Sequence, residues 1–207
     1  MSRSAIATIA VASGKGGVGK TYVSVCLARA LNALGASTLL YDGDLGLANC
    51  AVLLGLDEPD FEAAELCNAA GLHAMRHTDG LHLALRRPGT PGPTGLAPVF
   101  HAAQLAAFQC RLPLPLITVI DTPAGIAVDT MALLDIADRL LIVLNDEACA
   151  FLDAYALVKT CCERRRDVPI DVVTNRVASN DAGHRLYLRF AQVVDRFLGA
   201  DMAHLGS

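Results

Sequence analysis

The sequence predicts an α/β fold, namely a doubly wound and mostly parallel sheet with helices on both faces. Three observations support this fold class. Short apolar runs of strand length alternate along the chain with segments whose apolar residues recur at helical spacing. Residues 116–120 are apolar on both faces, as expected of a strand that is covered on each side. The first run, Ile6–Ala12, leads directly into a glycine-rich turn.

The chain is long enough for one sizeable core. Its 207 residues are 53% hydrophobic, so we expect a single domain over residues 1–207. The net charge of −4 gives no overall field that would attract nucleic acid, and DNA is not an expected partner. Two basic runs, residues 86–87 and 164–166, are more typical of solvated surfaces than of a DNA contact.

Cysteine and histidine usage favours neither disulfides nor metal clusters. The seven cysteines are scattered and form no Cys-x-x-Cys pair, which indicates a reducing, cytoplasmic location. His73, His77 and His82 lack acidic or cysteine partners at ligand spacing, so we expect ordinary histidines there. The chain shows no charged-then-apolar leader and no apolar run of membrane-spanning length.

The glycine-rich turn, residues 13–21, reads Ser-Gly-Lys-Gly-Gly-Val-Gly-Lys-Thr and fits the phosphate-binding pattern of Gly, four residues, Gly, Lys, then Ser or Thr. Glycines let the backbone curl so that successive N–H groups point at a phosphate chain. Lys20 supplies a point charge, and Thr21 supplies a hydroxyl for Mg²⁺. A glycine-rich turn that binds nothing is the alternative. We expect nucleotide contacts from Gly14, Lys15, Gly16, Gly17, Val18, Gly19, Lys20, Thr21 and Tyr22.

Two aspartates follow the second predicted strand. Apolar residues at helical spacing from Val23 to Leu34 predict a helix after the turn, and residues 38–41 predict a strand that ends at Asp42-Gly43-Asp44. Ligands collect at the carboxyl ends of strands in an open parallel sheet, so both carboxylates are expected beside the phosphate loop. Asp and Gly are also common turn residues, which is the competing interpretation.

The middle of the chain supplies a third acidic residue at a strand end. We predict a short helix at residues 61–70, a third strand at 81–85, and a surface loop at 87–98, where Pro and Gly are too frequent for a helix or a central strand. After a helix at 102–110, the fourth strand ends in Asp121. An aspartate in this position typically contributes a second Mg²⁺ contact through water.

The C-terminal part continues the alternation of strands and helices. Asn175 and Arg176 follow the last predicted strand, and the Asn175 amide offers one acceptor and two donors, enough to read an adenine edge. Asn175 would also be an ordinary turn residue. Gly199 is expected to close the last helix. The predicted elements are a fifth strand at residues 139–144, a helix opening at 151–159, a sixth strand at 169–174 and a last helix at 182–198.

Lys15 is not explained by an ordinary phosphate loop, because two ammonium groups in one short turn repel each other unless a polyanion lies between them. Gly14-Lys15-Gly16-Gly17-Val18-Gly19-Lys20-Thr21 resembles the deviant Walker A motif of the MinD/ParA superfamily, in which this first lysine crosses a dimer interface to the partner's nucleotide. Residues 44–56 and 153–159 are similar to the flagellar-number regulators called FlhG or FleN, a MinD-like branch. The resemblance implies an ATP-dependent homodimer that uses ATP/ADP and Mg²⁺.

The same resemblance implies roles for single residues. Asp44 would position the attacking water, and Gly125 would offer its N–H to the γ-phosphate. Asn175 and Arg176 would lie on the adenine side. Gly43, Pro123 and residues 145–147 depart from the flagellar pattern, and Pro123 is found in partition-type relatives. In all, the resemblance assigns Lys15, Lys20 and Asp44 to catalysis and Thr21, Asp42 and Asp121 to the magnesium site.

The function implied by the resemblance is a slow ATPase switch that regulates flagellar number or placement. Its partners would be a signal-recognition-like flagellar GTPase, a flagellar regulator or the basal-body switch. A partition or division-site ATPase and a nucleotide-binding module without turnover are the alternatives. An electron-transferring reductase would need cysteines where Ala124 and Ala127 stand. The family's last strand and C-terminal membrane helix are expected to be missing, so we predict a truncated, cytoplasmic chain whose full-length form could reach the inner membrane or cell pole.

Overall fold

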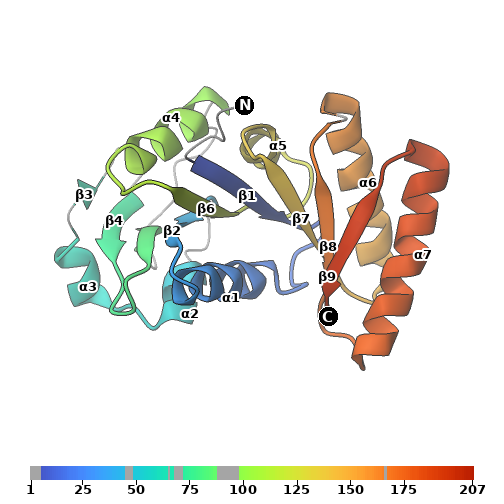
Figure 1. Cartoon of the computed structure of the whole chain (residues 1–207), viewed down its shortest axis with the longest axis horizontal. Coiled ribbons are helices and arrows are strands. Elements are labelled where there is room, and N and C mark those ends of the chain that lie inside the picture. Colours follow the sequence, from blue (N-terminus) through green and yellow to red (C-terminus); the bar gives the residue numbers. More distant parts are fainter. Residues whose placement is uncertain (1–5, 45–48, 65, 68–71, 88–97, 166) are drawn as a thin grey trace.

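The computed structural model describes residues 6–44, 49–64, 66–67, 72–87, 98–165 and 167–207. These residues form one nine-stranded sheet in the order β3-β4-β5-β2-β6-β1-β7-β8-β9, with helices on both faces (Figure 1). The strands are β1 (Ile6–Ala12), β2 (Ser37–Asp42), β3 (Leu66–Cys67), β4 (Leu72–Arg76), β5 (His82–Arg86), β6 (Leu116–Asp121), β7 (Arg139–Leu144), β8 (Ile170–Thr174) and β9 (Met202–Gly206).

The described helices divide between the two faces of the sheet. Buried residues of α1, α2 and α3 pack on one face, and those of α4 to α7 pack on the other, except that Ala150 at the start of α6 joins the first group. The helices are α1 (Lys20–Ala33), α2 (Asn49–Leu54), α3 (Glu58–Glu62), α4 (Pro98–Gln109), α5 (Val128–Asp135), α6 (Ala148–Arg164) and α7 (Asn180–Leu198).

The central strands are apolar throughout because alternate residues enter two different cores. In β7, Leu140, Ile142 and Leu144 face the helices α4 to α7, whereas Leu141 and Val143 face the opposite core. This double burial explains why the strand reads as a continuous apolar run. The predicted fold class is therefore confirmed: the sheet is parallel except where β3 and β4 pair antiparallel along the β5 edge.

Strand register brings the two acidic strand ends to the same level. β6 lies between β1 and β2, and Asp42 is the direct neighbour of Asp121. Gly43 N–H donates to the Asp121 carbonyl at 2.8 Å and holds the two strand ends together. Because the phosphate loop leaves β1 at this same carboxyl edge, the fold gathers the loop and both aspartates at one place.

Two predictions about the chain outside the central strands are wrong. The short helix predicted at residues 61–70 ends at Glu62 in α3, and Leu66–Cys67 pair antiparallel with β4 instead. The strand expected to be missing after the last helix is present, because β9 pairs in parallel with β8. In both cases pairing with a neighbouring strand decides the conformation, and local sequence patterns do not report it. Residues 65, 68–70 and 88–97 of the predicted helix and loop lie outside the described residues.

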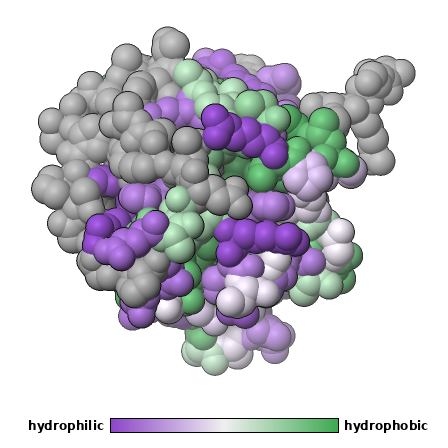
Figure 2. All heavy atoms as spheres, turned by 90° about the vertical axis from the view of Figure 1, so that its left-hand side faces the viewer, coloured by the Kyte–Doolittle hydropathy of each residue, from purple (hydrophilic) through white to green (hydrophobic). Residues whose placement is uncertain are grey.

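Five elements were not predicted, namely α2, β3, β4, α5 and β9. β4 is the inner strand of the antiparallel edge, next to β5. Figure 2 views the molecule from this edge, and hydrophilic and hydrophobic residues are interspersed over its coloured part. In the part of the chain that the structure describes, none of the helices combines the length and apolar character needed to span a bilayer.

The basic runs and the histidines have structural partners. Arg86 is buried, Arg164 pairs with Asp135, and Arg165 donates to the Ala137 carbonyl at 2.7 Å. His73 packs edge-on against the Phe61 ring, with centroids 5.3 Å apart, and His77 contacts Asp79 at 2.9 Å. These contacts favour structural roles for the described members of both sets over DNA or metal binding.

Candidate nucleotide site

The phosphate loop needs glycine at positions that the structure makes explicit. Gly17 and Gly19 have φ angles of 82° and 91°, in the left-handed region that favours glycine. At Gly14 the constraint is a close approach, since an added Cβ would lie 2.1 Å from the backbone carbon of Asp153 in α6. The loop is thus packed directly against the backbone of a helix that follows β7.

Lys20 is held under the loop by a buried acidic partner. Its Nζ lies 2.9 Å from Asp121 Oδ1, and both side chains are buried. The hydroxyl of Ser24, one helical turn further along α1, donates to the same oxygen at 2.9 Å. An ammonium group in this position can leave Asp121 and contact a phosphate when one binds in the loop.

Asp42 lies next to this pair and is completely buried. Its Oδ1 accepts the Asp44 N–H at 3.2 Å, and its Oδ2 has no hydrogen-bond partner among the described residues. Burial raises the pKa of Asp42 well above its usual range, and the negative charges of Asp121 and Asp44 raise it further. A buried carboxylate oxygen that lacks a hydrogen-bond partner, as Oδ2 does among the described residues, is expected to attract a cation.

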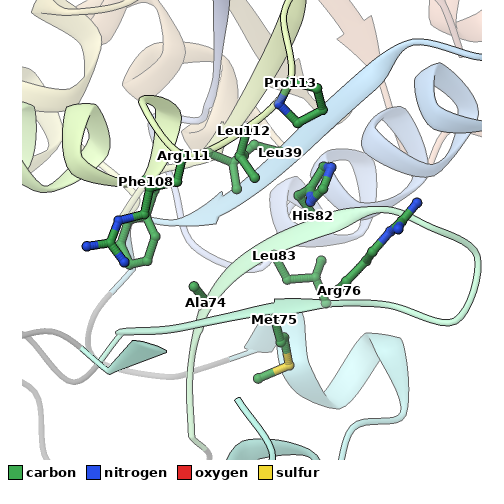
Figure 3. Close-up of a pocket in the computed structure, with 10 residues that line it drawn as sticks. All are labelled: Leu39, Ala74, Met75, Arg76, His82, Leu83, Phe108, Arg111, Leu112 and Pro113. Atoms are coloured by element: carbon green, nitrogen blue, oxygen red, sulfur yellow. The ribbon is translucent and has the colours of Figure 1, made fainter. Parts of the chain in front are cut away.

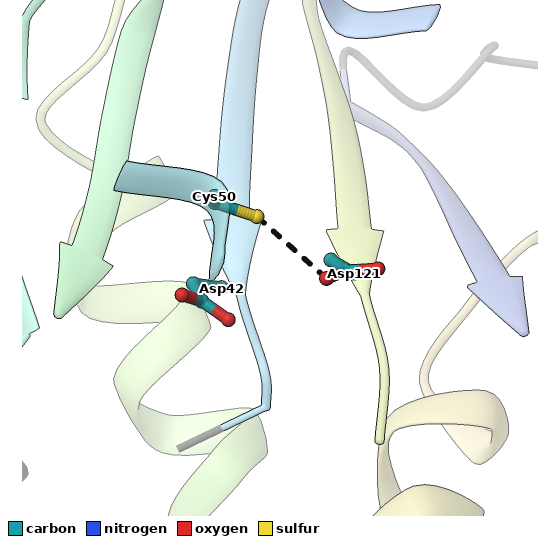
Figure 4. Close-up of side chains that lie close together, drawn as sticks. All are labelled: Asp42, Cys50 and Asp121. Atoms are coloured by element: carbon teal, nitrogen blue, oxygen red, sulfur yellow. Dashed lines mark hydrogen bonds between the residues drawn. The ribbon is translucent and has the colours of Figure 1, made fainter. Parts of the chain in front are cut away.

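Cys50 from α2 completes the buried cluster shown in Figure 4. Its Sγ lies 3.6 Å from Asp121 Oδ2, and the ligand atoms of Asp42, Cys50 and Asp121 all lie within 4.8 Å of one another. Burial, followed by the charges of the two aspartates, raises the pKa of the Cys50 thiol well above its usual range.

A cavity of about 460 Å³ opens at the phosphate loop. Asp44, the predicted water-positioning residue, lies on its wall together with Thr21, the predicted magnesium ligand. Such a volume is within the range of small-molecule sites. The cavity is lined by Ser13, Gly16, Gly17, Gly19, Lys20, Thr21, Tyr22, Asp44, Asn49, Val52, Leu53 and Ala124.

Lys15 points away from the buried cluster and pairs with Glu147 at the start of α6. The Lys15 Nζ to Glu147 Oε2 distance is 2.5 Å, and the Lys15 side chain is 40% exposed. The hydrogen bond to Glu147 raises the pKa of Lys15, and the same bond lowers the pKa of Glu147. Lys15 therefore lies at the surface in this structure, and Glu147 of the same chain balances its charge.

Asn175, Arg176 and Gly125 support the loop. Asn175 Nδ2 donates to the Val18 carbonyl at 2.9 Å, and Arg176 Nη1 donates to the Gly17 carbonyl at 2.7 Å. The Gly125 N–H, predicted to serve a γ-phosphate, donates to the Ser13 carbonyl at 2.9 Å. In this structure the three residues bind loop carbonyls, and the single N–H of Gly125 would have to give up its bond to Ser13 to serve a γ-phosphate.

The residues present fit a Mg²⁺ ion. Asp42 Oδ2 is a buried oxygen with no partner in the described part of the chain, and the carboxylate of Asp121 and the hydroxyl of Thr21 come from the neighbouring β6 and α1. Hard oxygen donors of this kind suit Mg²⁺, which usually keeps several waters and also binds substrate phosphates. Bound there, the ion would neutralise phosphate charge.

Ser24, Cys50 and Glu147 belong to the site but were not predicted. Ser24 lies four residues after Lys20, so helical periodicity places both on one face of α1, and that signal was available. Glu147 and Cys50 carry no such signal. They reach the site only through the path of β7 and α2, over sequence separations of 132 residues from Lys15 and 71 from Asp121.

A second cavity, of about 260 Å³, lies near the amino ends of β2 and β5, away from the phosphate loop. Figure 3 shows Arg76, His82 and Arg111 around it, with Leu39, Leu83 and Phe108 among the apolar residues. The described residues that line it include no acidic side chain and no glycine. The features expected of a triphosphate site lie instead at the carboxyl ends of the strands.

A glycine-rich turn between a buried strand and a helix, with its lysine held beside a strand-end aspartate, defines a phosphate-loop nucleotide-binding protein. The sequence identifies the kind of protein within that class. The family model described as the CobQ/CobB/MinD/ParA nucleotide binding domain matches residues 9–203, and the chain belongs to this family.

Three comparisons describe the relatives. The chain is 36% identical to the antiactivator FleN of Pseudomonas aeruginosa over 203 residues, which are 97% of this chain and 72% of that protein. It is 31% identical to the flagellum site-determining protein YlxH of Helicobacter pylori, over 96% of this chain and 68% of that protein. Cobyrinic acid a,c-diamide synthase of Mycobacterium smegmatis, solved with bound ADP and magnesium, has the same fold, with a TM-score of 0.68 at 20% identity over 93% of this chain and 82% of that one.

Replacing Asp42 by asparagine is expected to stabilise the metal-free protein. The pKa of Asp42 is raised above its ordinary value of 3.8, so the folded state holds this proton at pH values where the unfolded chain has lost it. Stability therefore falls as the pH rises from that ordinary value through the folded pKa, and Asp42→Asn removes this fall. At neutral pH we expect a gain of about 1–2 kcal/mol.

Urea unfolding with a chelator, from acidic to neutral pH, measures this effect. Asp44→Asn is the matched control, because Asp44 is only half-buried at the same strand end. The control should shift stability by less than ~0.5 kcal/mol. A gain for Asp42→Asn that is the same at every pH would contradict the assignment.

Proposed function

We propose that this protein is an ATP-dependent switch of the MinD type that dimerises with ATP and Mg²⁺, hydrolyses the ATP slowly, and regulates flagellar number or placement. The position of the two lysines carries the proposal. Lys20 is buried against Asp121, where it can serve a phosphate in the same chain, whereas Lys15 lies at the surface, where it can serve a second chain. One lysine directed into its own chain and one directed outward could contact the same triphosphate from two sides of a dimer interface.

Apolar residues around the cavity support a dimer. Tyr22 and Val52 line the cavity and are exposed, and Ile126 and Val128, shortly after Ala124 of the same wall, are exposed as well. Exposed apolar residues that cluster around a functional site typically mark an interaction surface. For Lys15 to reach a partner's nucleotide, its pair with Glu147 would first have to break.

The side chains suit hydrolysis by positioning and charge. The oxygen of a water would attack the γ-phosphorus while the bond to the β–γ bridging oxygen breaks, giving ADP and inorganic phosphate. Asp44 would orient that water, and Lys20 would leave Asp121 to stabilise charge on the phosphates. Thr21, Asp42 and Asp121 would hold Mg²⁺. Asn175 and Arg176 would keep the loop in shape and, by resemblance, approach the adenine.

Light scattering with chromatography tests the switch. The wild type should be monomeric with ADP and dimeric with a non-hydrolysable ATP analogue. Lys15→Ala should lose this change, whereas Lys159→Ala, a matched charge loss on α6, should keep it. A wild-type mass that never responds to nucleotide would refute the ATP-dependent dimer.

A phosphate-release assay then separates an enzyme from a nucleotide-binding module without turnover. Asp44→Ala should lower the turnover of the wild type on the order of 100-fold.

The cellular role is inferred from the two flagellar relatives. Partners would be a flagellar GTPase of the signal-recognition type, a flagellar regulator or the flagellar switch. Flagella can be counted in cells that carry Lys20→Met in place of the wild-type gene. An unchanged number, together with salt-sensitive binding to nonspecific DNA, would favour a partition ATPase instead.

A further inference from the structure

Cys50 is the one member of the buried cluster that an ordinary magnesium site does not need. Mg²⁺ takes oxygen ligands, whereas a cysteine sulfur selects softer cations such as Zn²⁺. The cysteine is nevertheless fully buried, with its sulfur directed at Asp121 Oδ2 (Figure 4). A site that combines two carboxylates with a thiol suits a softer cation than Mg²⁺.

The separation of the ligand atoms fits a tetrahedral ion. Zinc binds cysteine sulfur at about 2.3 Å and carboxylate oxygen at about 2.1 Å, so a tetrahedral angle places the two ligand atoms about 3.6 Å apart. The observed Cys50 Sγ to Asp121 Oδ2 distance is 3.6 Å. The Asp42 carboxylate lies within 4.8 Å of both, close enough for a small side-chain rotation to bring it into the same sphere.

The ligand atoms on this side of the cluster can be released for a cation. Asp121 uses Oδ1 for Lys20 and Ser24, while its Oδ2 accepts the Cys50 S–H, a hydrogen bond that ends when the thiol loses its proton to a metal. Asp42 Oδ2 is buried without a hydrogen-bond partner among the described residues. Because burying a carboxylate oxygen without a partner is costly, a bound cation would stabilise it.

Charge balance also favours a divalent ion. Two carboxylates and a thiolate carry three negative charges, and Lys20, at 2.9 Å from Asp121, carries one positive charge. A divalent cation brings the buried group to neutrality, which is the condition for burying charges at low cost. The protons of Asp42 and Cys50 would leave to solvent as the metal–oxygen and metal–sulfur bonds form.

We propose that Asp42, Cys50 and Asp121 form a site for a thiophilic divalent cation, Zn²⁺ or a similar ion, in the nucleotide-free protein. Three protein ligands leave a fourth position for water, as in open zinc sites. Because Asp42 and Asp121 are also the expected magnesium residues, the two ions exclude each other, and the thiophilic ion blocks turnover. Binding is independent of the proposed function, and only this inhibition rests on it.

Cobalt titration of the nucleotide-free protein tests the site. Co²⁺ stands in for Zn²⁺ and gives a thiolate charge-transfer band that the magnesium ligands cannot produce. Cys67 and the exposed Cys26, Cys110 and Cys149 are replaced by serine in every variant, so that these four thiols do not contribute. The band should appear at one equivalent of Co²⁺ and disappear when Zn²⁺ is added.

Cys50→Ser keeps a small hydrogen-bonding side chain but should abolish the band. Asp42→Asn should weaken cobalt affinity by on the order of tenfold to a hundredfold, as losses in a metal site do. Cys161→Ala is the matched control, since Cys161 is equally buried in the opposite core, and it should leave the band unchanged. Circular dichroism establishes that each variant is folded. No band in the folded parent, or an equal band in Cys50→Ser, would overturn the proposal.

ATP turnover at fixed Mg²⁺ supplies the second readout. Zn²⁺ should inhibit the parent, and Cys50→Ser should need at least ~10-fold more Zn²⁺ for the same inhibition. Equal inhibition of the two proteins would show that zinc acts elsewhere and overturn the blocking role. If the protein proves to have no turnover, the proposed function fails while the cobalt result still decides the metal site.

Discussion

Lys20→Met should lower the free energy of unfolding of the nucleotide-free protein by about 3–5 kcal/mol, because it leaves the buried carboxylate of Asp121 without a counter-charge. Methionine keeps the length and apolar stem of the side chain, so the loss reports charge and not volume. Denaturant unfolding of the wild type and the variant measures this loss.

The same substitution should lower ATP turnover by on the order of 100-fold to 1,000-fold, the effect of removing one group that stabilises transition-state charge. Lys20→Met combined with Asp121→Asn separates the two roles. The double variant should recover much of the stability, because no unpaired charge stays buried, but it should recover no turnover. Equal stabilities of the single and double variants would show that the Lys20–Asp121 pair contributes little to folding.

Gly14→Ala should cost about 3 kcal/mol of unfolding free energy and prevent tight nucleotide binding. The added methyl would lie 2.1–2.4 Å from backbone atoms of Asp153 and Ala154, and backbone cannot move aside as a flexible side chain can. The loop or the start of α6 must shift, which misplaces the N–H groups that would face phosphate. Thermal unfolding and fluorescent-nucleotide titration measure the two effects.

Gly16→Ala is the matched control for the packing effect. No atom lies within 4 Å of a Cβ built at Gly16, and its φ is outside the positive range. Alanine there should change stability by less than ~0.5 kcal/mol. If Gly14→Ala is as mild as this control, then the close approach of the loop to α6 is not a constraint on the fold.

Much of the fold was predictable because its signals are local. The continuous apolar run of β7 indicates a strand covered on both faces, without any knowledge of its neighbours. The spacing of glycine and lysine in the glycine-rich turn at residues 13–21 indicates a phosphate loop. The edges of the sheet were less predictable. β3 and β9 exist because they pair with β4 and β8, and the sequence of a short edge strand does not state its partner.

The amino-acid sequence alone determined the phosphate loop, the aspartates at the strand ends and the alternation of strands and helices, because each depends on residues close together in the chain. Tertiary structure decided the rest of the site. It brought Cys50 between Asp42 and Asp121 and matched Lys15 with Glu147. Contacts between residues 71 or 132 positions apart depend on how helices cross the sheet, and no spacing rule within one segment encodes them.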